Sequence, residues 1–461
     1  MSTPAFDPVI AATRFGVGLS PAATPDRSVA EMLERLSGPD VAAQRLPLPG
    51  LDTVSPSHRA FLEASRRDRT SRGTPDQEDA REAYRALRRE IEAEARRQHL
   101  TVLARMATSS DGLRERLVAF WADHFTVKPA NYAFRHLVVP YIEDAIRPHV
   151  AGRFADMAVA ATLHPVMMSY LDQTDSIGPN SATGERTGRG LNENLARELL
   201  ELHLLGVSAG YSQTDVTELA ELLTGLRYDG RNGFSYDAKR AEPGAEVILG
   251  RRYSAEADLN TVTAAIRDIC RAPQVAAHIA RKLAVHFVSP EPPEDLVTAI
   301  ATAFRDSDGD LARTTAALLN HPAAWSAERT KVRRPDLYVA AALRALDVPA
   351  DAILGFPRKA YVEWLRRPLA LMGQPWQNPT GPDGWSEAPS DWITPQGLAG
   401  RITWAMGAPS ALLADLPDPR AFVPAALGPE APPDVTFAAA AAEAKADGIG
   451  VVLASPAFQR I

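Results

Sequence analysis

The amino-acid sequence predicts a mainly α-helical protein, a large orthogonal bundle of many helices with a minor β hairpin and a Trp/Pro-rich loop region towards the C-terminus. Three observations support this fold class. Apolar residues recur at three- and four-residue steps along most of the chain, strand-like alternation is scarce, and Pro, Gly and Ser separate the periodic segments. The 461 residues are 45% hydrophobic and 23% charged, which is ordinary for a globular chain. We therefore expect residues 1–461 to form a single helical unit.

The first quarter of the chain contains a loop and two contrasting helices. Residues 38–58 are rich in Pro, Gly and Ser, which is typical of a surface loop. Residues 75–108 are dense in Glu, Arg and Ala with opposite charges at helical spacing, so they predict one long, charged and solvated helix that serves as a structural strut. Residues 113–125 are amphipathic, and His124 lies on their apolar stripe. This helix should face the core.

Helical periodicity recurs through the remainder of the chain. The segments are 137–146, 155–171, 191–206, 214–224, 259–269, 273–288, 294–305, 310–319 and 334–346. The strand-like stretch is 245–249, for which residues 233–236 offer a partner in a small hairpin. Residues 373–395 hold three Trp among turn formers and predict an ordered aromatic loop. The Pro/Ala-rich stretch 409–435 predicts a linker or surface wrap before a last helix near 436–446.

Composition excludes several classes of function. A formal charge of −7 and a pI near 5.9 provide no overall basic field, so general nucleic-acid binding is not expected. The single cysteine, Cys270, excludes an internal disulfide and a thiolate-rich metal site, and we expect it to be buried. Residues 1–21 lack the pattern of a secretory signal, and no apolar run reaches the length of about 18 residues needed to cross a bilayer. We expect a cytoplasmic protein without a membrane span.

The densest group of polar residues lies in the helix 191–206, within a pair of signature helices expected from 191 to 225. An Asn precedes the helix as a candidate N-cap, and Gly206 follows it as a candidate C-cap. At about 100° per residue, most leucines and His203 form a broad apolar arc. The other side carries Asn194, Arg197, Glu198 and Glu201. Leu205 interrupts the centre of this polar side, which favours an internal face.

These side chains are the candidate catalytic residues and metal ligands. Glu198 and Glu201 lie one turn apart, with Asn194 one turn before Glu198, so their oxygens can converge on a hard divalent cation such as magnesium. A histidine from another helix would suit iron or manganese, and His124 is our choice. In this hypothesis the carboxylates bind metal or act as acid and base, and Arg197 holds an anionic group of a small-molecule substrate.

Two other interpretations of these polar residues stay open. Arg197 can pair with Glu193 or Glu201, in which case the carboxylates only hold neighbouring helices together. Asp172 and Asp175 could join the helix in a magnesium–diphosphate site like that of isoprenoid cyclases, although the spacing of such enzymes is not reproduced. The strict Glu-x-x-His pair of di-iron bundles is also absent.

Several phrases together resemble one bacterial family, the domain-of-unknown-function family 1800. They are Arg14-Phe-Gly16, Phe120-Trp-x-x-His-Phe125, Ile146-Arg-Pro-His149, Tyr170-Leu-Asp172, Asn192-Glu-Asn-x-Ala-Arg-Glu-Leu-Leu-Glu-Leu-His-x-Leu-Gly-Val207, Asp215-Val216, Leu223-Thr-Gly225, Gly384-Trp385 and Ser455-Pro-x-Phe-Gln459. The resemblance implies a helical fold and no established general reaction. Where members typically have His-Asp before Pro-Gly, this chain has Ala241-Glu242, so a role of that His in relatives would be missing here.

Two functions are consistent with these patterns. The first is an enzyme of small-molecule, specialised metabolism, with a buried polar pocket that the Trp-rich loop caps and that holds a divalent metal. The second is a non-catalytic partner or scaffold protein that binds another protein through its Pro/Trp loops and helices. Burial of Glu198 and Glu201 together beside a cavity would favour the enzyme. Exposure of both carboxylates, with pairing to basic groups, would favour the partner or scaffold protein.

Overall fold

Helices account for 63% of the structure, a computed structural model that describes residues 5–230, 233–256 and 258–461. Two small antiparallel hairpins are the β structure of this described part. The predicted mainly α fold class is therefore confirmed. No helix among the described residues is both long and apolar enough to span a bilayer.

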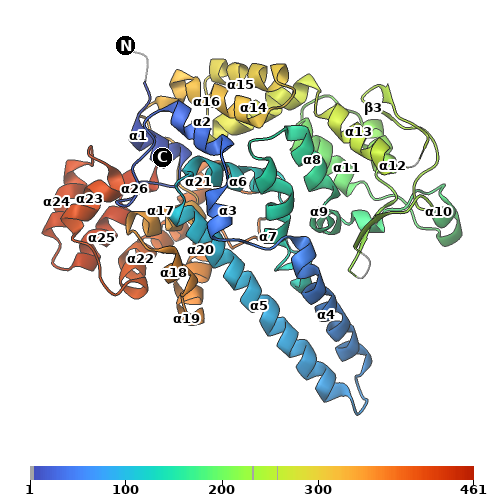
Figure 1. The fold of residues 1–461 in the computed structure, drawn as a ribbon, viewed down its shortest axis with the longest axis horizontal. Helices are drawn as coiled ribbons and strands as arrows, with labels where there is room; N and C mark the ends of the chain where they lie inside the picture. Colours follow the sequence, from blue (N-terminus) through green and yellow to red (C-terminus); the bar gives the residue numbers. More distant parts are fainter. Residues whose placement is uncertain (1–4, 231–232, 257) are drawn as a thin grey trace.

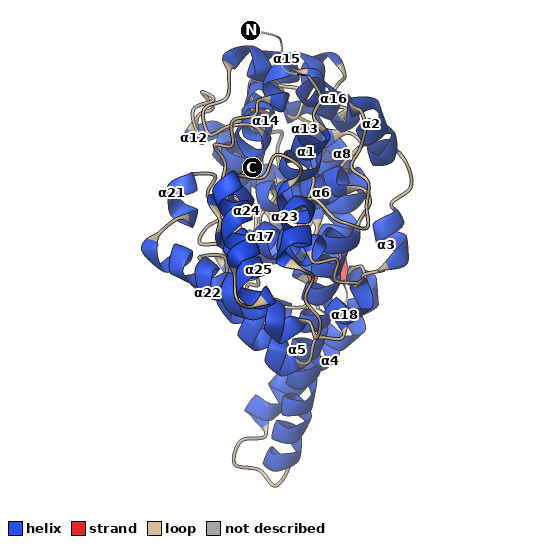
Figure 2. Cartoon of the chain, turned by 90° about the vertical axis from the view of Figure 1, so that its left-hand side faces the viewer, coloured by secondary structure: helices blue, strands red, loops and turns tan. Residues whose placement is uncertain are grey.

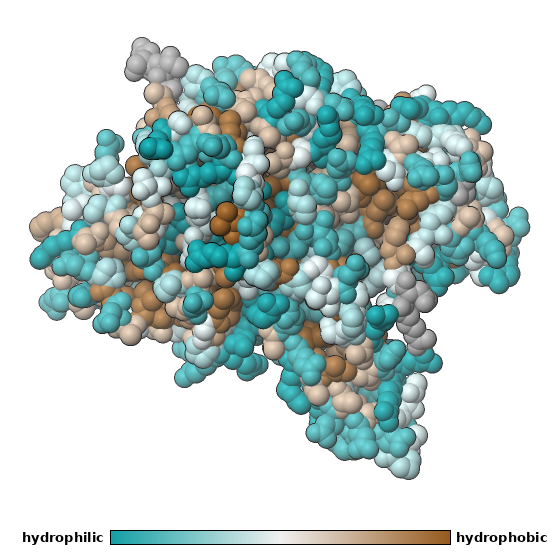
Figure 3. All heavy atoms as spheres, viewed as in Figure 1, coloured by the Kyte–Doolittle hydropathy of each residue, from teal (hydrophilic) through white to brown (hydrophobic). Residues whose placement is uncertain are grey.

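The N-terminal part contains a helical pair that projects from the body. Its elements are α1 (Pro8–Ile10), η1 (Ala11–Phe15), α2 (Val29–Ser37), α3 (Val41–Arg45), α4 (Leu51–Thr70), α5 (Gln77–Thr108) and α6 (Gly112–His124). Helices α4 and α5 run antiparallel and extend away from the other helices, as Figures 1 and 2 show. Hydrophilic residues cover the outer end of this projection (Figure 3). Helix α5 lies where the sequence predicts the long charged helix.

Helices α3 and α4 correct the loop predicted for residues 38–58. Leu51, Val54, His58 and Phe61 of α4 are buried at three- and four-residue spacing. This apolar stripe holds the helix together even though Pro56 lies inside it and lacks a backbone N–H. Pro content alone is therefore a poor guide to this segment.

The middle of the chain forms the larger body of helices. Its elements are η2 (Tyr132–Phe134), α7 (Val138–Tyr141), η3 (Ile142–Ile146), η4 (Arg147–His149), α8 (Phe154–Leu163), α9 (Pro165–Tyr170), η5 (Gln173–Asp175), α10 (Ala182–Thr187), α11 (Asn194–Glu198), η6 (Leu199–Leu204), α12 (Gln213–Leu222), α13 (Leu259–Ile269), α14 (Pro273–Phe287), α15 (Glu294–Asp306), α16 (Leu311–Asn320) and η7 (Pro322–Trp325). Helices α10 to α13 lie at the end of the molecule opposite to the C-terminal helices (Figure 1).

The two hairpins differ from the predicted pairing. Strand β1 (Leu226–Asp229) pairs with β2 (Gly233–Tyr236), and β3 (Val247–Ile248) pairs with β4 (Arg251–Arg252). The stretch 245–249 thus folds back on its own neighbour instead of joining 233–236. Gly250, at φ 76°, supplies the left-handed turn that makes this local pairing possible.

The C-terminal part is helical where the sequence predicts a linker. Its elements are α17 (Pro335–Ala345), α18 (Ala350–Leu354), α19 (Arg358–Ala360), η8 (Tyr361–Arg366), α20 (Arg367–Leu371), α21 (Pro389–Trp392), α22 (Pro395–Leu412), α23 (Pro419–Leu427), α24 (Pro433–Ala441), α25 (Lys445–Ala454) and α26 (Pro456–Gln459). Within 409–435, helix α23 starts at Pro419 and buries Phe422 and Val423. Proline fits the first turn of a helix, as Pro419 and Pro433 do, whereas Pro409 and Pro424 are tolerated inside helices.

Two hydrophobic clusters form the core of the described chain. The first draws its residues from between Ile10 and Trp325, and the second mainly from the region after Leu337. Helix α5 connects them, because Ile91 belongs to the first cluster and Leu100 to the second. The face of the molecule on either side of α5 is therefore where the two halves meet, and the cavities described below lie along this junction.

Candidate functional site

The signature helix begins as α11 and ends as the π-helical η6. Asn192 receives a hydrogen bond at its side-chain oxygen from the Asn194 amide, while Glu193 occupies the N-cap position. Gly206 follows the helix at φ 91°, as a C-terminal glycine should. The predicted apolar residues Leu195, Ala196, Leu199, Leu200, His203 and Leu204 are all buried, and Leu202 is half-buried. The helix therefore has the predicted inward face.

Its polar face is only partly exposed, because Arg197, Glu198 and Glu201 are half-buried. Asn194 is exposed, and the Arg197 side chain is 37% exposed. The Arg197 guanidinium forms ion pairs with Glu193 at 2.9 Å and with Glu201 at 3.3 Å. This is the pairing of the alternative interpretation, in which Arg197 and the carboxylates hold local structure. Leu205 is buried nonetheless, because the π-helical turn rotates it towards the core.

Glu198 is the member of this face that makes no ion pair with a described residue. Burial, and then the negative charges of Glu201 and Asp383, raise the pKa of its carboxyl. Asp383 comes from the Trp-rich loop, so the loop does approach the signature helix. The Tyr211 hydroxyl is hydrogen-bonded to Glu201, and burial together with this bond raises the pKa of Tyr211 to about 12.

His124 does not join these carboxylates. Its Nε2 donates a hydrogen bond to the carbonyl oxygen of His203 at 2.9 Å, and Nε2 of His278 donates likewise to the Leu202 carbonyl at 3.0 Å. The two imidazoles thus satisfy backbone carbonyls at the end of η6. Burial lowers the pKa of His124 well below its usual range. Nε2 is thus engaged with the backbone, whereas the buried Nδ1 has no hydrogen-bond partner among the described residues.

The metal-site prediction receives no geometric support from the donor positions. In the described ranges, no group of three or more His, Cys, Asp or Glu side chains is placed to hold a metal ion. Asp175, proposed for a diphosphate site, is 70% exposed and pairs with Arg189 at 2.8 Å. Cys270 is buried, as predicted.

A different site, which we call the inner chamber, lies between α5, α6, α7, η3 and the Trp-rich loop. It has a volume of about 140 Å³. Its apolar wall includes Val118, Ala119, Ala122, Val138, Val139 and Ile142. The loop contributes Trp376, Trp385, Gln374 and Gln377 to its lining. An apolar hollow with a few polar groups is the usual form of a small-molecule site.

Three Arg–carboxylate pairs contribute to the wall of the inner chamber. Arg105 pairs with Glu143 at 2.7 Å, Arg147 pairs with Glu115 at 2.5 Å, and Arg334 pairs with Asp123 at 2.6 Å. All six side chains are at most 14% exposed. Each of these guanidinium groups therefore has its counter-charge within the wall, and Asp336 adds a fourth carboxylate to the lining.

Asp123 connects α6 to the Trp-rich loop. Its Oδ2 accepts from the Arg334 guanidinium, and its Oδ1 accepts from the Trp385 backbone N–H at 2.9 Å. Burial raises the pKa of Asp123, whereas Arg334 and the Trp385 amide oppose that rise. Gly384 has φ 81°, and a Cβ there would lie 2.6 Å from Asp123 Oδ1. The loop can approach Asp123 only with glycine at this position.

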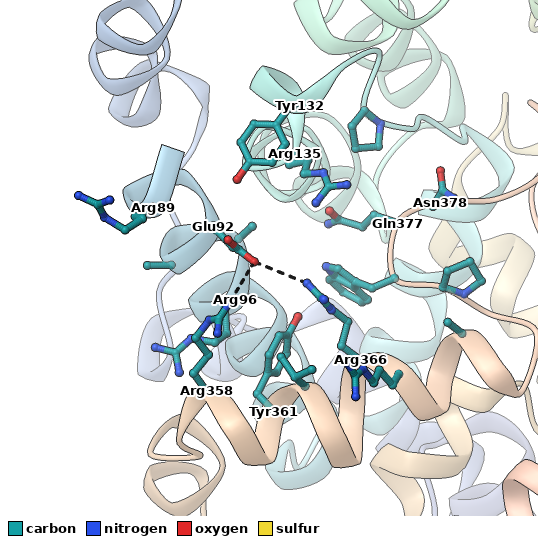
Figure 4. Close-up of a pocket in the computed structure, with 18 of the residues that line it drawn as sticks. Arg89, Glu92, Arg96, Tyr132, Arg135, Arg358, Tyr361, Arg366, Gln377 and Asn378 are labelled. Atoms are coloured by element: carbon teal, nitrogen blue, oxygen red, sulfur yellow. Dashed lines mark ion pairs between the residues drawn. The ribbon is translucent and has the colours of Figure 1, made fainter. Parts of the chain in front are cut away.

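The second cavity, which we call the outer cleft, is larger and has a different character. It has a volume of about 1050 Å³ and lies between α5, η2, the segment α19–η8–α20 and residues 375–378 (Figure 4). Six arginines and a single carboxylate, Glu92, are among its lining residues. The outer cleft and the inner chamber share Pro375, Trp376 and Gln377. This short segment is the partition between them.

Sequence reasoning missed both cavities, although signals were present. Asp123 immediately precedes His124 within the phrase Phe120-Trp-x-x-His-Phe125, but only the histidine stands out as a metal ligand. The run from Arg358 to Arg367 concentrates basic residues on a short helical stretch, in a chain of net charge −7. The Trp-rich loop is expected to cap a polar pocket, and it does line a cavity, but that cavity is not formed by Glu198 and Glu201.

Comparison with known proteins gives a family and nothing more specific. Residues 10–460 match the family described as "Protein of unknown function (DUF1800)". No curated protein and no solved structure matches the chain. The match covers nearly the whole sequence, so the chain belongs to this family, as its motifs predict.

Proposed function

We propose that this chain is an enzyme of small-molecule metabolism whose substrate binds in the inner chamber. The observation that carries the proposal is the chamber itself, in which apolar side chains of α6 and α7 face polar groups at the edge of the Trp-rich loop. A volume of about 140 Å³ suits a substrate, or a substrate group, of only a few heavy atoms. The site differs from the helix face that the sequence favours.

Asp123 is the residue that we assign to proton transfer in the chamber. It lines the cavity, and a carboxyl whose pKa is raised by burial is closer to the range in which it can both give and accept a proton near neutral pH. Arg334 and the Trp385 amide hold the carboxyl in a fixed orientation. Arg334 also supplies the positive charge that an anionic intermediate would need.

The proposal is tested by filling the chamber. Ala122 is half-buried and lines the cavity, so Ala122→Phe occupies the space that the substrate would use. Wild-type protein and this variant are each incubated with a metabolite extract. Mass spectrometry then measures which compounds are depleted from the extract and which are retained by binding to the protein. We expect wild type to deplete at least one compound that the variant leaves unchanged. Circular dichroism melting checks that the variant is folded.

A second variant separates catalysis from binding. Asp123→Asn keeps the shape of the side chain but removes the titrating carboxyl. Retention of the compound without turnover in this variant is the expected result. Retention without turnover in wild type as well would favour the non-catalytic alternative. No difference between wild type and Ala122→Phe in either depletion or retention would refute the chamber as the site.

A further inference from the structure

The outer cleft has an unbalanced charge. Its lining includes Arg89, Arg96, Arg135, Arg358, Arg366 and Arg367, against one carboxylate, that of Glu92. This is a formal excess of five positive charges in one concavity of a chain whose net charge is −7. In Figure 4, Arg135 and Arg366 lie on either side of Gln377 and come from separate segments of the chain.

The arginines of the cleft are weakly paired. Glu92 is 3.7 Å from Arg358 and 3.6 Å from Arg366, both long for an ion pair. The other four arginines form no ion pair with any residue that the structure describes. Other arginines of the same helix α5 do find partners, since Arg97 pairs with Glu94 at 2.7 Å. Mutual repulsion of guanidinium groups in a cleft is relieved when an anion enters between them.

An aromatic platform forms one side of the same cleft. The Trp376 indole is stacked on the His99 imidazole, with ring centroids 3.8 Å apart and an angle of 7° between the planes. The His99 ring is held from its edge by the Tyr361 hydroxyl, 3.0 Å from Nδ1. Trp376 and Tyr361 both line the cleft. A fixed indole beside guanidinium groups suits a ligand that has a planar ring as well as negative charge.

We propose that the outer cleft binds a small molecule that carries two or more phosphate groups and a planar ring. Guanidinium groups bind phosphate oxygens in a bidentate manner, and several phosphates are needed to match a formal excess of five charges. The volume of about 1050 Å³ accommodates such a molecule. A nucleic acid is a poorer match, because it would contact the surface beyond the cleft, and the chain as a whole is acidic.

This inference does not depend on the function proposed for the inner chamber. The arginines lie outside the chamber, and only Pro375, Trp376 and Gln377 are shared. The variant Ala122→Phe alters the chamber alone, and it should leave binding in the cleft unchanged. Failure of one proposal is thereby distinguishable from failure of the other.

The test is calorimetric titration of the full chain with tripolyphosphate, ATP and orthophosphate as probes. We expect ATP and tripolyphosphate to bind with one-to-one stoichiometry and orthophosphate to bind much more weakly. The cleft variant Arg135→Gln/Arg366→Gln should weaken tripolyphosphate about 100-fold, at about tenfold for each charged hydrogen-bond donor lost. Trp376→Leu should weaken ATP more than tripolyphosphate, because only ATP has a ring to stack.

A matched control removes the same charge elsewhere. Arg72 and Arg81 are exposed near the turn between α4 and α5, away from the cleft. The variant Arg72→Gln/Arg81→Gln should change the affinity for tripolyphosphate less than about threefold at constant ionic strength. An equal loss in both double variants, or no binding by wild type, overturns the proposal. Binding of a single-stranded oligonucleotide more tightly than ATP would also overturn it, in favour of a general polyanion surface.

Discussion

The inner chamber and the outer cleft share three lining residues, yet the arginines of the chamber are paired with carboxylates and most of those of the cleft are not. In the chamber wall, Arg105, Arg147 and Arg334 each have a carboxylate within 2.7 Å. In the cleft, most of the arginines have no such partner among the described residues. A buried charge without a partner is strongly destabilising, whereas an exposed one costs little. The paired arginines therefore hold the chamber wall, where Arg334 also orients Asp123, and the cleft arginines that lack a carboxylate partner are the ones proposed to bind a ligand.

The largest effect is expected when one arginine is removed from each site, which tests whether the chamber arginines stabilise the fold more than the cleft arginines do. Arg147→Ala should lower the free energy of unfolding by about 3–5 kcal/mol, because it leaves the buried Glu115 and the half-buried Asp40 without their partner. Arg135→Ala in the cleft should change it by no more than about 0.5 kcal/mol. Urea denaturation of the two variants measures both values. Equal effects would mean that the two sites do not differ as described.

The approach of the Trp-rich loop to Asp123 gives the next largest effect. Gly384→Ala places a Cβ 2.6 Å from Asp123 Oδ1 at a positive φ, so we expect a loss of about 2 kcal/mol. Gly73 is a matched control, since it has φ 79° and a Cβ added there would meet no heavy atom within 4 Å. Gly73→Ala should cost only the backbone strain, about 1 kcal/mol. Identical urea midpoints for the two variants would contradict the close approach.

A smaller effect concerns the partition between the two cavities. Burial lowers the pKa of His99 to about 3, below the value of about 6.5 for an unfolded chain. On acidification, His99 therefore takes up its proton in the unfolded state before it does so in the folded state. This favours the unfolded state, so the free energy of unfolding decreases as pH falls from 6.5 towards 3. Between about pH 7.5 and about pH 5, wild type should lose on the order of 1–2 kcal/mol more than His99→Phe. Parallel pH profiles of unfolding would show that His99 is not buried as described.

The smallest effect is expected on the thermal stability of the ligand-free protein when two arginines of the cleft are replaced. Arg135→Gln/Arg366→Gln removes like charges that face one concavity, so its thermal midpoint should equal or slightly exceed that of wild type at low salt. Added sodium chloride should reduce the difference, because it screens the repulsion. A clear fall in the midpoint would indicate that these arginines stabilise the fold through contacts of their own.

The sequence predicts the helices better than it predicts the site. The amphipathic segments of α6, α13 and α14 follow from apolar spacing, which local periodicity encodes directly. Proline misleads the prediction at α4 and α23, because a proline can start a helix or be tolerated inside one that packs well. The internal position expected for the helix face with Glu198 and Glu201 rests on Leu205 alone, and a π-helical turn buries that leucine instead.

The cavities could not be predicted because their residues are far apart in the sequence. Asp123 meets Arg334 and Trp385 across more than 200 residues. The cleft combines arginines of α5 with those of α19, η8 and α20 and with the residue Arg135 after η2. Periodicity and motif spacing report on neighbours along the chain, whereas such contacts follow from how the two hydrophobic clusters pack along α5.

The central distinction is between the paired arginines of the chamber and the unpaired arginines of the cleft. Thermal unfolding with and without tripolyphosphate, at constant ionic strength, tests it most directly. A ligand that binds only the folded state raises its stability by mass action. We predict that tripolyphosphate raises the midpoint of wild type and of Arg72→Gln/Arg81→Gln by several degrees, and that it leaves Arg135→Gln/Arg366→Gln unchanged. The same rise in all three proteins would contradict the assignment of the unpaired arginines to an anion site.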